Sequence, residues 1–84
     1  MLFITTMNII PGNYKKAIKL FKNPVIQDGI EIKSFFGMFG IPDTILIFEA
    51  PNEETAGSFI LQFGEVAELK TSVAVPIERM SWVH

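Results

Sequence analysis

Hydrophobic residues recur along the chain with two different spacings, which predict the order of its secondary-structure elements. Apolar residues at every second position, or in a short continuous run, are typical of strands, whereas spacing at i, i+3, i+4 and i+7 is typical of amphipathic helices. The strand pattern covers residues 2–10, 29–40, 44–50 and 71–79, and the helical spacing follows Asn13 and Asn52. The predicted order is therefore βαββαβ.

The first helical segment separates apolar from basic side chains. Its apolar side consists of Tyr14, Ala17, Ile18 and Phe21, and its opposite side consists of Lys15, Lys16, Lys19 and Lys22. The helix should end at Asn23, because Pro24 disfavours helical geometry in the residue before it and cannot donate a backbone hydrogen bond. We expect the lysines to form a solvated face, and the alternative is a docking patch for a partner.

The second helical segment has its own start and stop signals. Asn52 is a good N-cap, and Glu53 and Glu54 suit the first turn, where carboxylates interact favourably with the helix dipole. The apolar stripe that follows consists of Ala56, Phe59, Ile60 and Phe63. Gly57 costs the helix up to about 1 kcal/mol relative to alanine. Gly64 stands where a left-handed C-terminal cap is expected.

This element order within 84 residues predicts a single α+β domain with the ferredoxin-like fold, a four-stranded antiparallel sheet with two helices on one face. The first and third strands of this fold are central. The distribution of charge agrees, because charged residues concentrate in the expected edge strands. They are Glu31, Lys33, Glu78 and Arg79, and Pro76 is tolerated only on an edge strand or at a bulge.

Both faces of the predicted sheet are apolar. The first strand places Leu2 and Ile4 opposite Phe3, Met7 and Ile9, and the third places Ile45 and Ile47 opposite Leu46 and Phe48. Two helices cover only one face, and an uncovered apolar face would exceed the few hundred Å² or so that monomers usually expose. The composition, 49% apolar and 19% charged, also favours a partner. We therefore expect a homodimer whose sheets pack face to face.

The composition excludes several kinds of site and partner. The absence of cysteine excludes disulfide bonds, a thiolate nucleophile and cysteine-ligated metal. His84 is the only histidine, so we expect no metal site, no cofactor and no histidine-based triad. The net charge of −2 does not attract nucleic acid or anionic lipid, and no apolar run reaches the length of a membrane span. We expect a cytoplasmic protein with neither a nucleic-acid nor a membrane partner.

Several short segments resemble the GYD-domain family of small dimeric α/β-barrel proteins. They are Gly40-Ile41-Pro42-Asp43, Phe48-Glu49-Ala50-Pro51, the alanine-containing start of the second helix, Gly64 and Lys70-Thr71, roughly the C-terminal half of the chain. Pro42 stands where the family has the tyrosine of its Gly-x-Tyr-Asp turn. Leu2-Phe3-Ile4 and Val75-Pro76 are similar to the corresponding segments of a neighbouring uncharacterised family with the same fold.

The resemblance implies a dimer but does not choose one activity. The wider dimeric α/β-barrel group includes cofactor-free monooxygenases, haem-degrading enzymes, lactone isomerases and ligand-sensing domains. Our leading hypothesis is a homodimeric module that binds or senses a small apolar metabolite in a cleft between sheet and helices. The alternatives are a cofactor-independent monooxygenase or isomerase, and a structural or regulatory interaction module.

The candidate catalytic residues are Glu49 and Asp43. Glu49 is the one acid within a central strand, where burial could make it a general base, and the alternative is an exposed or lysine-paired carboxylate. Asp43 belongs to the family-like turn, although turns select aspartate for local backbone hydrogen bonding whatever the function.

The candidate ligand-binding residues are polar or aromatic side chains of the predicted strands and of the second helix. They are Thr6, Asn8, Ser34, Phe36, Phe48, Phe59 and Phe63. Thr5 and Thr71 are further strand polars that could line the cleft or be satisfied within the core. We expect Trp82 to pack the C-terminal tail onto the dimer and His84 to be a frayed terminus.

Overall fold

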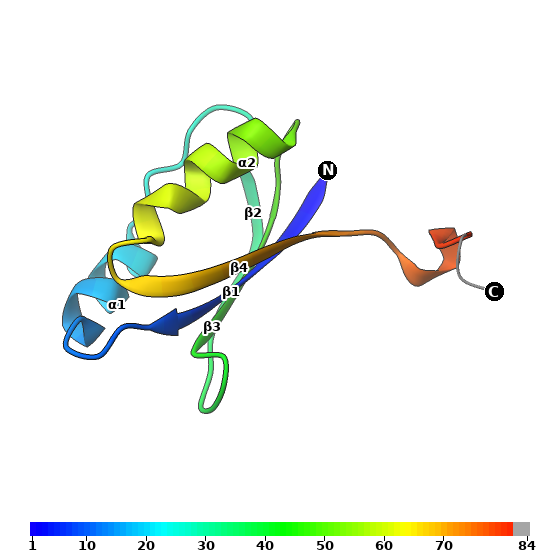
Figure 1. The fold of residues 1–84 in the computed structure, drawn as a ribbon. Helices are drawn as coiled ribbons and strands as arrows, with labels where there is room; N and C mark the ends of the chain where they lie inside the picture. The colour runs from blue at the N-terminus through cyan, green and yellow to red at the C-terminus, as the bar shows by residue number, and fades with distance from the viewer. Residues whose placement is uncertain (82–84) are drawn as a thin grey trace.

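The computed structural model describes residues 1–81 and contains one antiparallel sheet with the strand order β2-β3-β1-β4 (Figure 1). In chain order the elements are β1 (Leu2–Ile9), α1 (Tyr14–Lys22), β2 (Glu31–Gly37), β3 (Thr44–Glu49), α2 (Glu53–Ile60), the 3-10 helix η1 (Leu61–Phe63), β4 (Ala67–Ala74) and the 3-10 helix η2 (Ile77–Arg79). The predicted α+β, ferredoxin-like βαββαβ fold is confirmed, with β1 and β3 in the centre.

Alternation along the central strands decides which side chains the helices cover. Phe3 and Met7 of β1, with Leu46 and Phe48 of β3, are at most 3% exposed. Phe3 lies directly opposite Phe48 in the register of the two strands. The intervening residues point to the other face, because successive side chains of a strand point in opposite directions. They are Leu2, Ile4, Ile45 and Ile47, and all four are half-buried.

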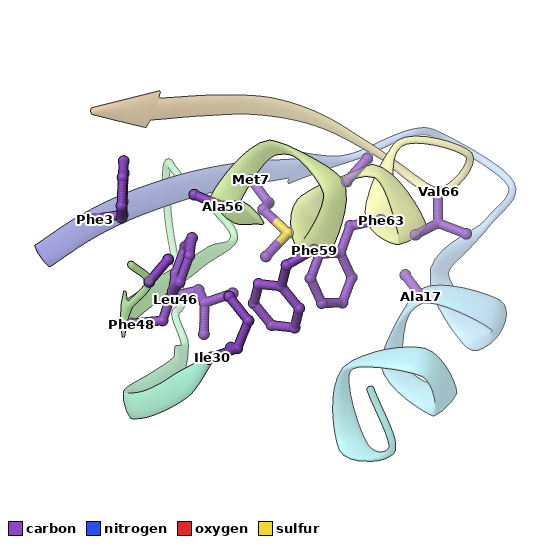
Figure 2. Close-up of a cluster of buried hydrophobic side chains, with 12 residues drawn as sticks. Phe3, Met7, Ala17, Ile30, Leu46, Phe48, Ala56, Phe59, Phe63 and Val66 are labelled. Atoms are coloured by element: carbon purple, nitrogen blue, oxygen red, sulfur yellow. The ribbon is translucent and has the colours of Figure 1, made fainter. Parts of the chain in front are cut away.

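Aromatic rings fill the space between the helices and the sheet (Figure 2). Phe48, Phe59 and Phe63 are at most 1% exposed. The ring centroids of Phe48 and Phe59 are 5.0 Å apart, and those of Phe59 and Phe63 are 5.9 Å apart, both with edge-to-face geometry. This geometry is the favoured one for aromatic pairs and adds to the free energy gained by burial. Side chains of α1 and α2 join this same cluster, so both helices cover one face of the sheet.

The predicted end of the first helix and the predicted start of the second helix are confirmed. Helix α1 ends at Lys22, directly before Asn23 and Pro24. The side chain of Asn52 accepts a hydrogen bond from the backbone N–H of Thr55 at 2.8 Å, which confirms the N-cap. The lysines of α1 are solvent-exposed, as predicted for a solvated face. Neither helix within residues 1–81 is long and apolar enough to cross a membrane.

The predicted left-handed cap at Gly64 is wrong. Gly64 has a right-handed φ of −65°, and its backbone N–H donates to the carbonyl oxygen of Leu61 at 3.0 Å. The last turn tightens into η1 instead of ending in a left-handed residue. A 3-10 turn satisfies orphan carbonyls at the end of an α-helix without positive φ.

The predicted limits of the second and fourth strands also need correction. β2 covers only Glu31–Gly37 of the predicted 29–40, because the chain leaves the sheet after Gly37. β4 covers Ala67–Ala74 rather than 71–79, and pairs with β1 along its full length. β4 ends at Ala74, which pairs with Leu2, the first residue of β1, and η2 follows after Pro76.

Candidate functional site

The open sheet face is the side of the sheet that turns away from the helices. It consists of Leu2, Ile4, Thr6 and Asn8 of β1, Glu31, Ser34 and Phe36 of β2, Ile45, Ile47 and Glu49 of β3, and Glu68, Lys70, Ser72 and Ala74 of β4. The centre of this face is apolar, and its charged groups lie on β4 and where the paired Glu31 and Glu49 stand at one end of β2 and β3. Phe36 is 55% exposed, so an aromatic ring stands on the face without cover from the described chain.

The sheet separates the predicted ligand-binding residues into two groups. Phe48, Phe59 and Phe63 belong to the fully buried core beneath the helices. Thr6, Asn8, Ser34 and Phe36 lie on the open sheet face. One small ligand cannot contact both groups, because the backbone of the sheet lies between them.

The two candidate catalytic carboxylates lie at opposite ends of β3. Oδ2 of Asp43 accepts a hydrogen bond from the backbone N–H of Ile9 at 2.7 Å. Glu49 is exposed at the far end of the strand. The position of Glu49 lacks the desolvation that favours a general base, whereas the half-buried Asp43 already accepts a backbone hydrogen bond.

A charged pair lies beside Glu49 on the edge strand. Nζ of Lys33 is 2.6 Å from Oε2 of Glu31. The hydrogen bond from Lys33 to Glu31 and the negative charge of Glu31 raise the pKa of Lys33, and Glu49 adds a smaller effect of the same sign. Both side chains are well exposed, so solvent screens the pair and it acts as a surface ion pair.

The α2–β4 hollow is a concave site of about 320 Å³ on the helical side of the sheet. Its lining residues are Phe3, Glu53, Ala56, Gly57, Ile60, Thr71 and Val73. Apolar side chains dominate this lining, and Glu53 and Thr71 are the polar members. Small-molecule sites are typically hollows of roughly 300–1,000 Å³ that combine an apolar lining with a few polar groups. The volume of the α2–β4 hollow lies at the lower end of this range, and its lining combines apolar and polar groups.

Two contacts stabilise the walls of this hollow. The ring of Phe3 stacks on Phe48, with centroids 5.5 Å apart and an interplanar angle of 19°. The hydroxyl oxygens of Thr5 and Thr71 lie 2.7 Å apart in a hydrogen bond between β1 and β4. Because Thr5 is fully buried, this hydrogen bond holds the Thr71 side chain in place on the more exposed strand.

Gly57 leaves part of this hollow open. A Cβ atom added at Gly57 would meet no heavy atom within 4 Å outside its own helix. The packing of α2 therefore does not require glycine here, although alanine would stabilise the helix by up to about 1 kcal/mol. Thr71 was predicted as a possible lining residue, whereas Phe3 and Gly57 were not predicted. The signal available for Gly57 was its place inside an apolar helix stripe.

Two further hollows lie at opposite ends of the open sheet face. The first, of about 530 Å³, is the arm-end hollow, lined by Met1, Leu2, Glu49, Val73, Ala74, Val75, Pro76 and Arg79. The second, of about 310 Å³, is the hairpin-end hollow, lined by Thr6, Asn8, Ile41, Pro42, Glu68, Leu69 and Lys70. We call residues 75–81, which follow β4, the arm, and residues 38–42, which lie between β2 and β3, the hairpin tip. The two hollows are named after these segments.

The part of the chain that the structure describes contains no cluster of three or more histidine, aspartate or glutamate side chains placed to hold a metal ion. Trp82 and His84 lie outside the described residues. Comparisons with known protein families, with curated proteins and with solved structures gave no significant match to this chain.

Proposed function

We propose that this protein is a homodimeric binding or sensing module for a small, mostly apolar metabolite, and that the metabolite binds in the α2–β4 hollow. The observation that carries this proposal is the space beside Gly57, which packing leaves open although a larger residue would favour the helix. Val73, which is 48% exposed, and the half-buried Ile60 supply the accessible apolar surface of this hollow.

The polar groups of the hollow suit a ligand with one polar end. Glu53 lies in the first turn of α2, and Thr71 lies across from it on β4. The carboxylate of Glu53 can accept a hydrogen bond from an amine or hydroxyl, and the hydroxyl of Thr71 can donate or accept one. We therefore propose a ligand whose apolar body lies against Ile60 and Val73 and whose amine or hydroxyl group faces Glu53.

The apolar open sheet face supports the homodimer. Leu2, Ile4, Ile45 and Ile47 are only half-buried in a single chain, and Phe36 is more exposed still. A second copy of the same sheet would bury this face on both subunits. A face-to-face dimer is also the assembly that the resemblance of its segments to the GYD-domain family implies.

Native mass spectrometry of the protein, purified gently from its own host, tests the ligand. We expect a dimer that carries a defined small adduct. The Gly57→Leu variant should lose the adduct, because the leucine side chain occupies the hollow while it favours the helix. Ser58→Leu is the matched control, since Ser58 is exposed on the same helix.

Two results would contradict the proposed site. An adduct that persists in Gly57→Leu at the wild-type level would mean that the ligand binds elsewhere. An adduct lost equally in Ser58→Leu would mean that the loss reflects a change in α2 as a whole. A panel of small amines and alcohols, screened for an increase in melting temperature of the wild type but not of Gly57→Leu, provides an independent measurement.

A further inference from the structure

The hairpin tip projects apolar side chains into solvent. Phe39 is fully exposed and Ile41 is 90% exposed, while Met38 is 40% exposed. Figure 1 shows this loop standing clear of the rest of the chain on the side away from the helices. Ile41 and Pro42 also line the hairpin-end hollow with Thr6 and Asn8, so the tip projects on the side of the open sheet face.

The arm forms a concave apolar surface at the opposite end of the same face. After β4 the arm leads away from the sheet and the helices (Figure 1). Its Val75 and Ile77 are 42% and 74% exposed. The backbone hydrogen bonds of η2 and Ser81 are made within the arm itself. The arm-end hollow opens between this segment and Leu2 of the open sheet face.

The hairpin tip and the arm would enlarge an interface formed by the sheet face. Four strands about 4.8 Å apart and about six residues long cover roughly 400 Å² as a flat area. A standard interface buries about 800 Å² of accessible surface on each subunit. The exposed apolar side chains of the hairpin tip and the arm add to what the face itself can bury.

We propose that two copies associate through their open sheet faces in opposed orientation, so that the hairpin tip of each copy inserts into the arm-end hollow of the other. The projection and the hollow lie on one face but at opposite ends of the strands. A two-fold axis that is parallel to the sheets and runs obliquely across the strands exchanges the two ends of the strands. Its incline carries the tip, which continues β2 and β3, toward the arm, which continues β4 at the other edge of the sheet. The same contact then forms twice. The contact is isologous and closes as a dimer.

The other face-to-face arrangement fits the surface less well. A two-fold axis along the strands would place the two Phe39 side chains at the same end and leave both arm-end hollows facing each other. The opposed arrangement also matches charges. Glu68 and Lys70 at the hairpin end approach Arg79 and Glu49 at the arm end, and neither Arg79 nor Lys70 forms an ion pair within residues 1–81. This inference rests on the proposed homodimer and not on the proposed ligand.

Site-specific crosslinking tests the orientation, because the natural chain has no cysteine. Met38→Cys retains the Phe39 side chain, and Ala74→Cys places a thiol in the arm-end hollow. The two variants are coexpressed, treated with a short bifunctional maleimide and analysed by denaturing gel and mass spectrometry. The control pair is Met38→Cys with Ile26→Cys, since Ile26 is exposed outside the open sheet face.

We expect a covalent heterodimer of Met38→Cys with Ala74→Cys, and none from the control pair or from Met38→Cys alone. A covalent dimer of Met38→Cys alone would overturn the opposed orientation and leave the homodimer intact. A dimer in light scattering that gives no heterodimer crosslink would also overturn it. A monomeric wild type would overturn both the orientation and the homodimer, whereas the adduct measurement tests the ligand separately.

A substitution at the projection itself gives a second measurement. Phe39→Asp should raise the dimer dissociation constant by at least about tenfold, because an aspartate inserted into an apolar hollow loses its hydration. Ile26→Asp removes a similarly exposed apolar side chain elsewhere and should leave the dissociation constant unchanged. An unchanged dissociation constant in Phe39→Asp would overturn the proposed insertion.

Discussion

The carboxylate of Asp43 accepts a hydrogen bond from the backbone N–H of Ile9 at 2.7 Å, which joins the turn between β2 and β3 to the end of β1. The backbone carbonyl of Asp43 also accepts from the N–H of Met38 at 2.8 Å. Asp43 therefore fixes the base of the hairpin tip on which the proposed dimer contact depends.

Replacement of Asp43 should destabilise the fold measurably. Hydrogen bonds to charged groups contribute about 1.5–3 kcal/mol, so Asp43→Ala should lower the free energy of unfolding by about 1.5–2 kcal/mol. Asp43→Asn should lose less, because its amide oxygen can still accept from Ile9. Urea denaturation measures both, with Asp28→Ala as an exposed-turn control. Equal losses in Asp43→Ala and Asp28→Ala would show that the hydrogen bond is not the cause.

The hydroxyl pair of Thr5 and Thr71 should behave non-additively. Thr71→Val leaves the buried hydroxyl of Thr5 without its partner, which costs about 1–3 kcal/mol. Thr5→Val with Thr71→Val removes both hydroxyls and should recover much of that loss. A double-mutant cycle by thermal unfolding should therefore give a coupling energy of about 1 kcal/mol. A coupling energy near zero would contradict a hydrogen bond between the two side chains.

Thr44 carries a second buried hydroxyl, which differs from that of Thr5 in its hydrogen bonding. Thr44 is 3% exposed, and its hydroxyl has no hydrogen-bond partner in the described residues. Thr44→Val replaces this buried polar atom with a methyl group of similar size, so the free energy of unfolding should stay equal or rise by up to about 1 kcal/mol. Calorimetry of Thr44→Val and Thr5→Val compares their free energies of unfolding. A clear loss of stability in Thr44→Val would indicate a hydrogen-bond partner for the Thr44 hydroxyl.

Replacing a buried and an exposed phenylalanine should change the free energy of unfolding by very different amounts. Phe59→Ala removes a fully buried ring that contacts Phe48 and Phe63, and should cost about 3–5 kcal/mol. Such a loss is a large part of the roughly 5–15 kcal/mol that stabilises most domains. Phe39→Ala should leave the stability of the folded chain nearly unchanged, because Phe39 is fully exposed. Circular dichroism melts at a concentration where the protein is monomeric measure both.

Local patterns were sufficient to predict most elements, and failed where the chain leaves regular structure. The start of α2 at the Asn52 cap and the end of α1 before Asn23 depend on residues within one helical turn. The start of β4 does not depend on such local residues, because Ala67 joins the sheet only through its pairing with Ile9, far away in the sequence. The right-handed φ of Gly64 likewise results from the tightening of the last helical turn into η1. The presence of a glycine in the sequence does not indicate this tightening.

Candidate sites were harder to predict than elements, because a site combines residues from different elements. Asp43 and Thr71 were identified as polar positions, but their partners Ile9 and Thr5 depend on the register of the sheet. The three phenylalanines Phe48, Phe59 and Phe63 fit a ligand cleft by composition. The structure packs them against one another as the core.

The sequence by itself determined the order βαββαβ and the alternation of apolar residues on both faces of the sheet, because both follow from spacing between near neighbours. Only the tertiary structure decided that space remains beside Gly57 and that the projection of Phe39 and the arm-end hollow lie at opposite ends of one face. Hollows and projections are properties of how distant segments pack. Packing depends on register, twist and side-chain volume together, and periodicity along one strand or helix does not specify these.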